Sequence, residues 1–126
     1  MDRVDVLTSA AATGNHENVQ ALLQAGVDAN AVNRFGRTAL QVMMMGSTAV
    51  ARVLLQYGAD PSVRDRDTGG TPLHDASRGG FLDTVKVLVA HGAEVDARDY
   101  GDQRPIDLAR ENGYRDVVDF LELHLH

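Results

Sequence analysis

The chain has 126 residues, of which 44% are hydrophobic, 24% are charged and only 5% are aromatic, and it contains no Trp and no Cys. A chain of this length is expected to form one domain, and the absence of Cys excludes disulfides, thiolate metal sites and cysteine nucleophiles. The net charge of −6 disfavours nucleic acid and anionic membranes as partners, and favours a basic surface on another protein.

The first five residues, MDRVD, lack the basic start and the long apolar run of a secretory signal. No segment approaches the roughly 20 apolar residues that a membrane-spanning helix needs. We therefore expect the protein in the cytoplasm and the nucleus.

A period of 33 residues organises the chain. An apolar residue recurs at this spacing, a mostly small residue follows three positions later, and two glycines then mark the turn and the end of each unit. The columns are Leu7, Leu40, Leu73 and Ile106; Ala10, Met43, Ala76 and Ala109; Gly14, Gly46, Gly80 and Gly113; and Gly26, Gly58 and Gly92. The sequence therefore predicts a single domain over 1–126 built from four repeats, at about 3–32, 33–65, 66–98 and 99–126.

Each repeat is predicted to form a helix, a turn, a second helix and a loop. In the first repeat, small Ala10 allows close helix packing, and Val19, Leu22 and Leu23 give the second helix an apolar face. Gly26 is expected to close that helix in the left-handed conformation that only glycine adopts at low cost.

The second repeat departs from this pattern. Gly46 follows Leu40 by six residues, whereas the matching glycines follow their anchors by seven, so its first helix is predicted to be one residue shorter. The run QVMMM at 41–45 also replaces the small residues expected there, and the loop at 60–70 regains the lost residue. Local rules are broken most often at functional sites.

The third repeat opens with Thr71-Pro72-Leu73-His74, in which Thr71 can cap the helix and Pro72 suits its first turn. This phrase and the 33-residue period are the ankyrin signature. We predict an all-α fold: an ankyrin-repeat solenoid of about four helix-turn-helix repeats with short β-turn loops, stabilised by contacts between neighbouring repeats.

Four segments are more specific than the repeat itself: FGR at 35–37, QVMMMGS at 41–47, HDA at 74–76 and GFLDT at 80–84. With them, and with the shortened second-repeat helix, the chain resembles the ankyrin-repeat inhibitors of cyclin-D-dependent kinases of the four-repeat tumour-suppressor type. The resemblance extends from about Leu7 to Leu121. It implies a protein that binds the monomeric kinase beside the ATP cleft through its concave face and loop tips and blocks cyclin docking. The implied result is arrest of the cell cycle in G1.

The resemblance also implies which residues contact the kinase. These are Glu17, Met43, Met44, Asp65, His74, Asp75, Arg78, Phe81 and Asp83, and the main one is Asp75, as a carboxylate partner for a kinase arginine. The chain departs from the family pattern at Asn15, where a basic residue is usual, at Ser77, where Ala is usual, at Gly79, a glutamate-like position, and at Tyr100-Gly101-Asp102, where an aromatic and a shifted turn glycine are expected.

Several of these residues also have a structural interpretation. Met43 lies in the stacking column, where Met is a good filler of irregular gaps, so we expect packing there, and Met44 is equally open to exposure. We expect His74 to hydrogen-bond between neighbouring repeats and to be a secondary contact. Phe81 could be partly buried packing, and Asp75 could be an ordinary solvated helix residue.

The alternative functions are an ankyrin-repeat adaptor or scaffold with a different protein client, and a purely structural repeat array. We expect no enzymatic activity, no cofactor and no bound metal. The loop DRDTGG at 65–70 is similar to the start of an EF-hand calcium loop. Counted from Asp65, however, the fifth position is Gly69 instead of an oxygen ligand, and the twelfth is Ala76 instead of Glu. We expect a monomer whose partner is a cyclin-D-dependent protein kinase.

Overall fold

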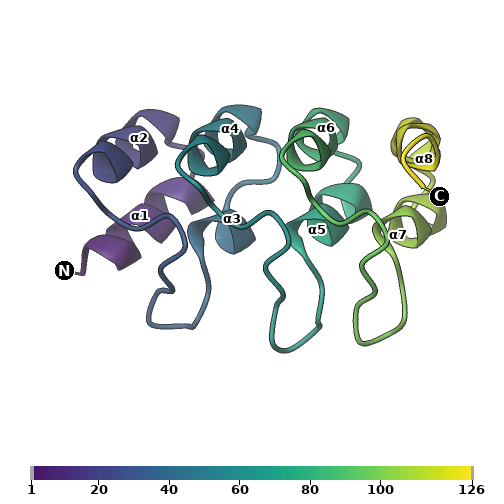
Figure 1. Cartoon of the computed structure of the whole chain (residues 1–126), viewed down its shortest axis with the longest axis horizontal. Coiled ribbons are helices and arrows are strands. Elements are labelled where there is room, and N and C mark those ends of the chain that lie inside the picture. The colour runs from purple at the N-terminus through teal and green to yellow at the C-terminus, as the bar shows by residue number, and fades with distance from the viewer. Residues whose placement is uncertain (1, 126) are drawn as a thin grey trace. The chain divides into compact units, whose positions relative to one another are not determined.

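The computed structural model describes residues 2–125, and all regular secondary structure in that range is helical (Figure 1). Eight helices form four pairs. They are α1 (Arg3–Ala12) with α2 (His16–Gln24), α3 (Ala39–Val42) with α4 (Thr48–Gln56), α5 (Pro72–Arg78) with α6 (Leu82–Ala90), and α7 (Pro105–Glu111) with α8 (Arg115–Glu122). The all-α prediction is therefore confirmed. None of these helices is long and apolar enough to cross a membrane within the described part of the chain.

The chain divides into two compact units, Met1–Asp60 and Pro61–His126, and each unit contains two helix pairs. The helix pairs fall within the four repeats predicted at 3–32, 33–65, 66–98 and 99–126. Residues 1 and 126 lie outside the described range, so the bounds of the single domain over 1–126 stay a prediction.

In the first unit, α1 packs against α2 and α3, and α2 packs against α4. The helices therefore form two layers, α1 with α3 and α2 with α4 (Figure 1). The predicted column residues Leu7 and Leu40 are fully buried, together with Val50 and Leu54 of α4. Gly26 has φ +97° after α2, as the left-handed closing position requires.

The first helix of the second repeat, α3, has four residues, whereas α5 and α7 have seven each. The shortening therefore exceeds the one residue predicted from the sequence. Thr38 and Gln41 form a capping box at its start, with the Gln41 side chain accepting a hydrogen bond from the Thr38 N–H at 2.8 Å. The helix ends because Met43 takes an extended backbone, with φ −58° and ψ 155°. The Met44 N–H then donates to the carbonyl of Ala11 in the first repeat, at 2.9 Å. A contact with the neighbouring repeat therefore replaces the next turn of α3.

In the second unit, α5 packs against α6 and α7, and α8 packs against α6 and α7. His74 is fully buried and joins its two repeats. Its Nδ1 accepts a hydrogen bond from the Thr71 N–H at 3.0 Å, so Nε2 carries the proton and donates to the Gln103 carbonyl at 2.8 Å. The structural role expected for His74 is present.

The loop before α7 contains one strained position. Asp102 has φ +63°, the only positive φ of a non-glycine residue in the described range. Gly69 and Gly36 stand 33 and 66 residues earlier, with φ +72° and +78°. Asp102 thus occupies the turn-glycine position of its repeat, where the sequence departs from the family pattern. Asp tolerates this conformation better than most residues.

Candidate partner-binding surface

Helix α5 places two of the predicted residues, Asp75 and Arg78, on one face, because residues three apart are neighbours along a helix surface. Gly79, the C-cap residue of α5, follows directly after Arg78. An Oδ1 atom of Asp75 accepts a hydrogen bond from Nη1 of Arg78 at 2.8 Å, and the two side chains are 45% and 48% exposed. This ion pair, accessible to solvent over almost half its surface, is the electrostatic feature of the surface.

Asp75 is also partly removed from water by its surroundings. Burial raises the pKa of the Asp75 carboxyl above its ordinary value, and the Arg78 guanidinium opposes that shift. An additional cation from a partner would therefore stabilise the charged carboxylate, which the protein alone solvates incompletely.

The Phe81 ring lies next to this ion pair. It folds back over Gly79, so closely that a Cβ at position 79 would overlap the ring. The ring is nevertheless 41% exposed. The projecting position expected from the sequence and the packing alternative are therefore both realised, because one side of the ring rests on the backbone and the other meets solvent.

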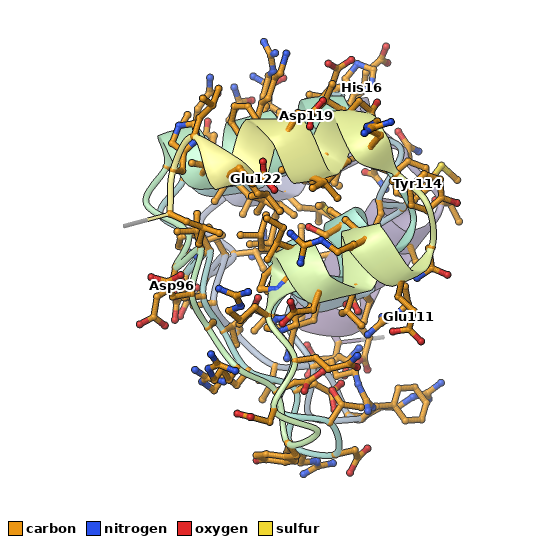
Figure 2. All side chains as sticks on the ribbon, turned by 90° about the vertical axis from the view of Figure 1, so that its right-hand side faces the viewer. His16, Asp96, Glu111, Tyr114, Asp119 and Glu122 are labelled. Atoms are coloured by element: carbon orange, nitrogen blue, oxygen red, sulfur yellow. The ribbon has the colours of Figure 1, made fainter. Side chains whose placement is uncertain are left out.

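A second ring, which the sequence prediction missed, lies beside it. Tyr114 comes from the turn between α7 and α8, at the edge of the last repeat in Figure 2, and its ring covers Gly80. Gly80 has φ +76°, and Tyr114 remains 37% exposed. A signal for this residue was present, since Tyr114 stands 33 residues after Phe81 and so occupies the same column of the repeat.

The other predicted residues of the second unit differ in what they offer to a partner. Asp83 is exposed in the first turn of α6. The carboxylate of Asp65 accepts hydrogen bonds from the N–H groups of Asp67 and Thr68, at 2.8 and 3.2 Å, and so shapes its own loop. His74 has no exposed surface, so a direct contact of its side chain with a partner is not available in the folded chain.

In the first unit, the predicted residues gather at the turn between α1 and α2. The sulfur of Met44 faces Gly14, at 3.1 Å from the position that a Cβ would take there, and the side chain is 48% exposed. Glu17 is exposed in the first turn of α2. Met43 is only 4% exposed, so the packing interpretation holds for Met43 and its side chain does not reach the surface.

No group of three or more His, Asp or Glu side chains in the described residues is arranged to hold a metal ion. The features that remain are a half-exposed ion pair, two aromatic rings on glycines and a thioether. In the second unit, the ion pair and the two rings can bind another protein through charge and apolar contact; in the first unit, the exposed Met44 thioether offers apolar contact.

Comparisons with known proteins agree with this description. A family model described as ankyrin repeats (3 copies) matches residues 2–65 and 58–124. The chain is 56% identical to the human cyclin-dependent kinase 4 inhibitor B over 91% of this chain and 83% of that protein. It is 52% identical to the human cyclin-dependent kinase inhibitor 2A over 93% of this chain and 75% of that protein.

A more distant match is the putative E3 ubiquitin-protein ligase XBAT35 of Arabidopsis thaliana, at 34% identity over 96% of this chain but only 27% of that protein. Ankyrin repeats alone therefore do not distinguish kinase inhibitors from other repeat proteins, whereas identity above 50% over most of both chains does. The chain belongs to the ankyrin-repeat family of cyclin-dependent kinase inhibitors.

Proposed function

We propose that this protein binds a monomeric cyclin-D-dependent kinase beside its ATP cleft, blocks cyclin docking and thereby arrests the cell cycle in G1. The observation that carries the proposal is the half-exposed Asp75–Arg78 pair beside the Phe81 ring. These residues stand where the resemblance implies the densest kinase contacts. The names of the relatives, cyclin-dependent kinase 4 inhibitor B and cyclin-dependent kinase inhibitor 2A, support the same class of target.

Charge supports a basic partner surface. Residues 61–126 contain 13 acidic and eight basic side chains, whereas residues 1–60 contain five and four, so most of the net charge of −6 belongs to the second unit. That unit also carries Asp75, Asp83 and Phe81. Complementary charge raises the association rate and selects among partners more than it adds affinity.

Inhibition of this kind needs no catalytic group on the inhibitor. A kinase that exchanges between an active arrangement of its lobes and a twisted one is inhibited by a ligand that binds the twisted one more tightly. The extent of inhibition depends on that difference in affinity alone. Asp75 contributes to it if its kinase arginine is within reach only in the twisted arrangement. The protein would act as a monomer in the cytoplasm and the nucleus.

The test is a calorimetric titration of the chain into a monomeric cyclin-D-dependent kinase, with a cyclin-E/A-type kinase as the control. We expect tight binding at a one-to-one ratio to the first kinase only. Absence of binding to either kinase, by a chain whose helical circular dichroism shows that it is folded, would reject the inhibitor and leave an ankyrin adaptor with a different client.

A further inference from the structure

The turns that open α6 and α8 present the same pair of side chains twice. Phe81 and Tyr114 immediately precede the two helices, and Asp83 and Asp116 follow two residues later in the first helical turns. Both carboxylates are exposed. The surface therefore alternates an aromatic ring with a negative charge in the third and the fourth repeat.

The two rings cover consecutive glycines. Gly79 lies under the Phe81 ring and Gly80 lies under the Tyr114 ring, and a Cβ at either position would overlap the ring above it. Adjacent Cα atoms are about 3.8 Å apart, so the two rings rest on neighbouring positions of one short backbone segment. Phe81 and Tyr114, which we call the aromatic pair, therefore cover adjacent backbone positions although they come from different repeats.

Packing within the unit leaves part of the aromatic pair exposed to solvent. Phe81 and Tyr114 are 41% and 37% exposed, and within the described residues the Tyr114 hydroxyl makes no hydrogen bond. Aromatic side chains are enriched in protein interfaces, since a ring supplies a large contact area and loses few rotamers on binding. A tyrosine also keeps a hydroxyl for a polar contact at the rim.

The aromatic pair continues directly from the ion pair of the proposed interface. Gly79 is the C-cap residue of α5, its N–H donates to the Asp75 carbonyl at 3.2 Å, and the Phe81 ring covers it. A protein segment whose cation reaches Asp75 would therefore pass over Phe81 next. The Tyr114 ring covers Gly80, the next residue along the backbone.

We propose that Tyr114 is a further partner-binding residue, and that the aromatic pair receives an apolar side chain of the same kinase surface whose cation pairs with Asp75. The proposal rests on the proposed function and extends its interface into the fourth repeat. The occupant is an apolar residue flanked by basic residues, which matches rings flanked by Asp83 and Asp116.

The experiment compares three variants with the unaltered chain in calorimetric titrations against the monomeric kinase. Tyr114→Ala removes the ring, Tyr114→Phe keeps the ring without its hydroxyl, and Tyr57→Ala removes a tyrosine of similar exposure, 42%, at the end of α4. We expect Tyr114→Ala to weaken binding about tenfold, as for an interface residue whose truncation costs a little more than about 1 kcal/mol. Tyr114→Phe should stay within about threefold and Tyr57→Ala should bind as the unaltered chain does.

The Tyr114 ring also packs on Gly80, so Tyr114→Ala can lower the stability of the chain. A fluorine label on the unaltered chain tests the contact without this substitution. The chain has three tyrosines, so incorporation of 3-fluorotyrosine gives three fluorine resonances, assigned by single substitutions. Addition of the kinase should shift or broaden the Tyr114 resonance and leave that of Tyr57 unchanged.

The outcomes separate the two proposals. If the unaltered chain binds the kinase but Tyr114→Ala binds equally well, or the Tyr114 resonance does not respond, the aromatic pair is not part of the interface and the proposed function stands. If the unaltered chain does not bind the kinase at all, the proposed function fails and this inference fails with it.

Discussion

Replacing Asp75 by Asn removes one negative charge from α5 and keeps the shape of the side chain. In the chain alone, the replacement costs the ion pair with Arg78, a pair spaced by three residues and exposed over almost half its surface. Pairs of this kind contribute about 0.2–0.5 kcal/mol, because water screens both charges. The free energy of unfolding should therefore change by less than about 0.5 kcal/mol, and circular dichroism and thermal melting should be nearly unaltered.

The effect on kinase binding should be much larger. Removing one partner of a hydrogen-bonded charge pair that becomes buried in a complex costs about 2–5 kcal/mol, because the other charge loses its partner. We expect a loss near 2 kcal/mol, since Arg78 already neutralises part of the Asp75 charge in the unbound chain. At about 1.4 kcal/mol per factor of ten, this is an increase in Kd of about 30-fold. Calorimetric titration measures it directly.

The same carboxylate should make binding depend on pH. Burial raises the pKa of Asp75 in the unbound chain, and a kinase cation would lower that pKa in the complex. Binding then releases a proton at acidic pH, so affinity should rise with pH through the raised pKa and become constant above it. For folding alone the sign is opposite, because a raised folded-state pKa makes the charged carboxyl less favourable as pH increases. Asp75→Asn should lose the pH dependence of binding.

Asp119→Asn is the matched control, because Asp119, labelled in Figure 2, is an exposed helical carboxylate on α8, whereas the ion pair lies on α5. It should bind as the unaltered chain does. A drop in the melting temperature of Asp75→Asn with little change in Kd would show that Asp75 is a structural residue, and would refute the reasoning.

Three further predictions concern stability. Ser77 is fully buried and its hydroxyl has no hydrogen-bond partner in the described residues, so Ser77→Ala should raise the free energy of unfolding by about 1–2 kcal/mol in urea titrations; a loss of stability would reveal a partner for the hydroxyl. Asp102→Gly should raise the melting temperature by a few degrees, because it relieves about 1 kcal/mol of left-handed strain; a lower melting temperature would mean that the exposed Arg98–Asp102 ion pair, at 3.4 Å, outweighs the strain. Gly92→Val should lower the free energy of unfolding by about 2 kcal/mol, because Gly92 has φ +92° and no atom lies within 4 Å of its Cβ position, so the effect is conformational only. An unchanged melt of this variant would contradict the assigned role of Gly92 as a helix-closing residue.

The parts of the fold that depend on spacing could be predicted from the sequence. The column of Leu7, Leu40, Leu73 and Ile106 is buried, with at most 1% exposure, because each helix pair must cover an apolar face with its neighbour. The length of α3 could not be predicted. Its end depends on the extended backbone at Met43 and on the hydrogen bond from Met44 to Ala11, which joins two repeats and leaves no local sequence signal.

The candidate surface could be predicted in part. The sequence placed Asp75, Phe81 and Asp83 by resemblance, and all three have accessible surface. It did not indicate that the Asp65 carboxylate organises its own loop, because that depends on the fold of residues 65–70. Tyr114 lies outside the segments that carry the family resemblance, although it shares a column of the 33-residue period with Phe81.

The most direct test of the central claim is the phosphorylation of a retinoblastoma-protein substrate by a cyclin-D-dependent kinase that has been incubated with increasing amounts of this chain before cyclin is added. The account predicts that activity falls to near zero at about one equivalent of the unaltered chain, that Asp75→Asn requires a large excess, and that a cyclin-E/A-type kinase keeps its activity. Full activity of the cyclin-D-dependent kinase at saturating amounts of the folded chain would contradict the account.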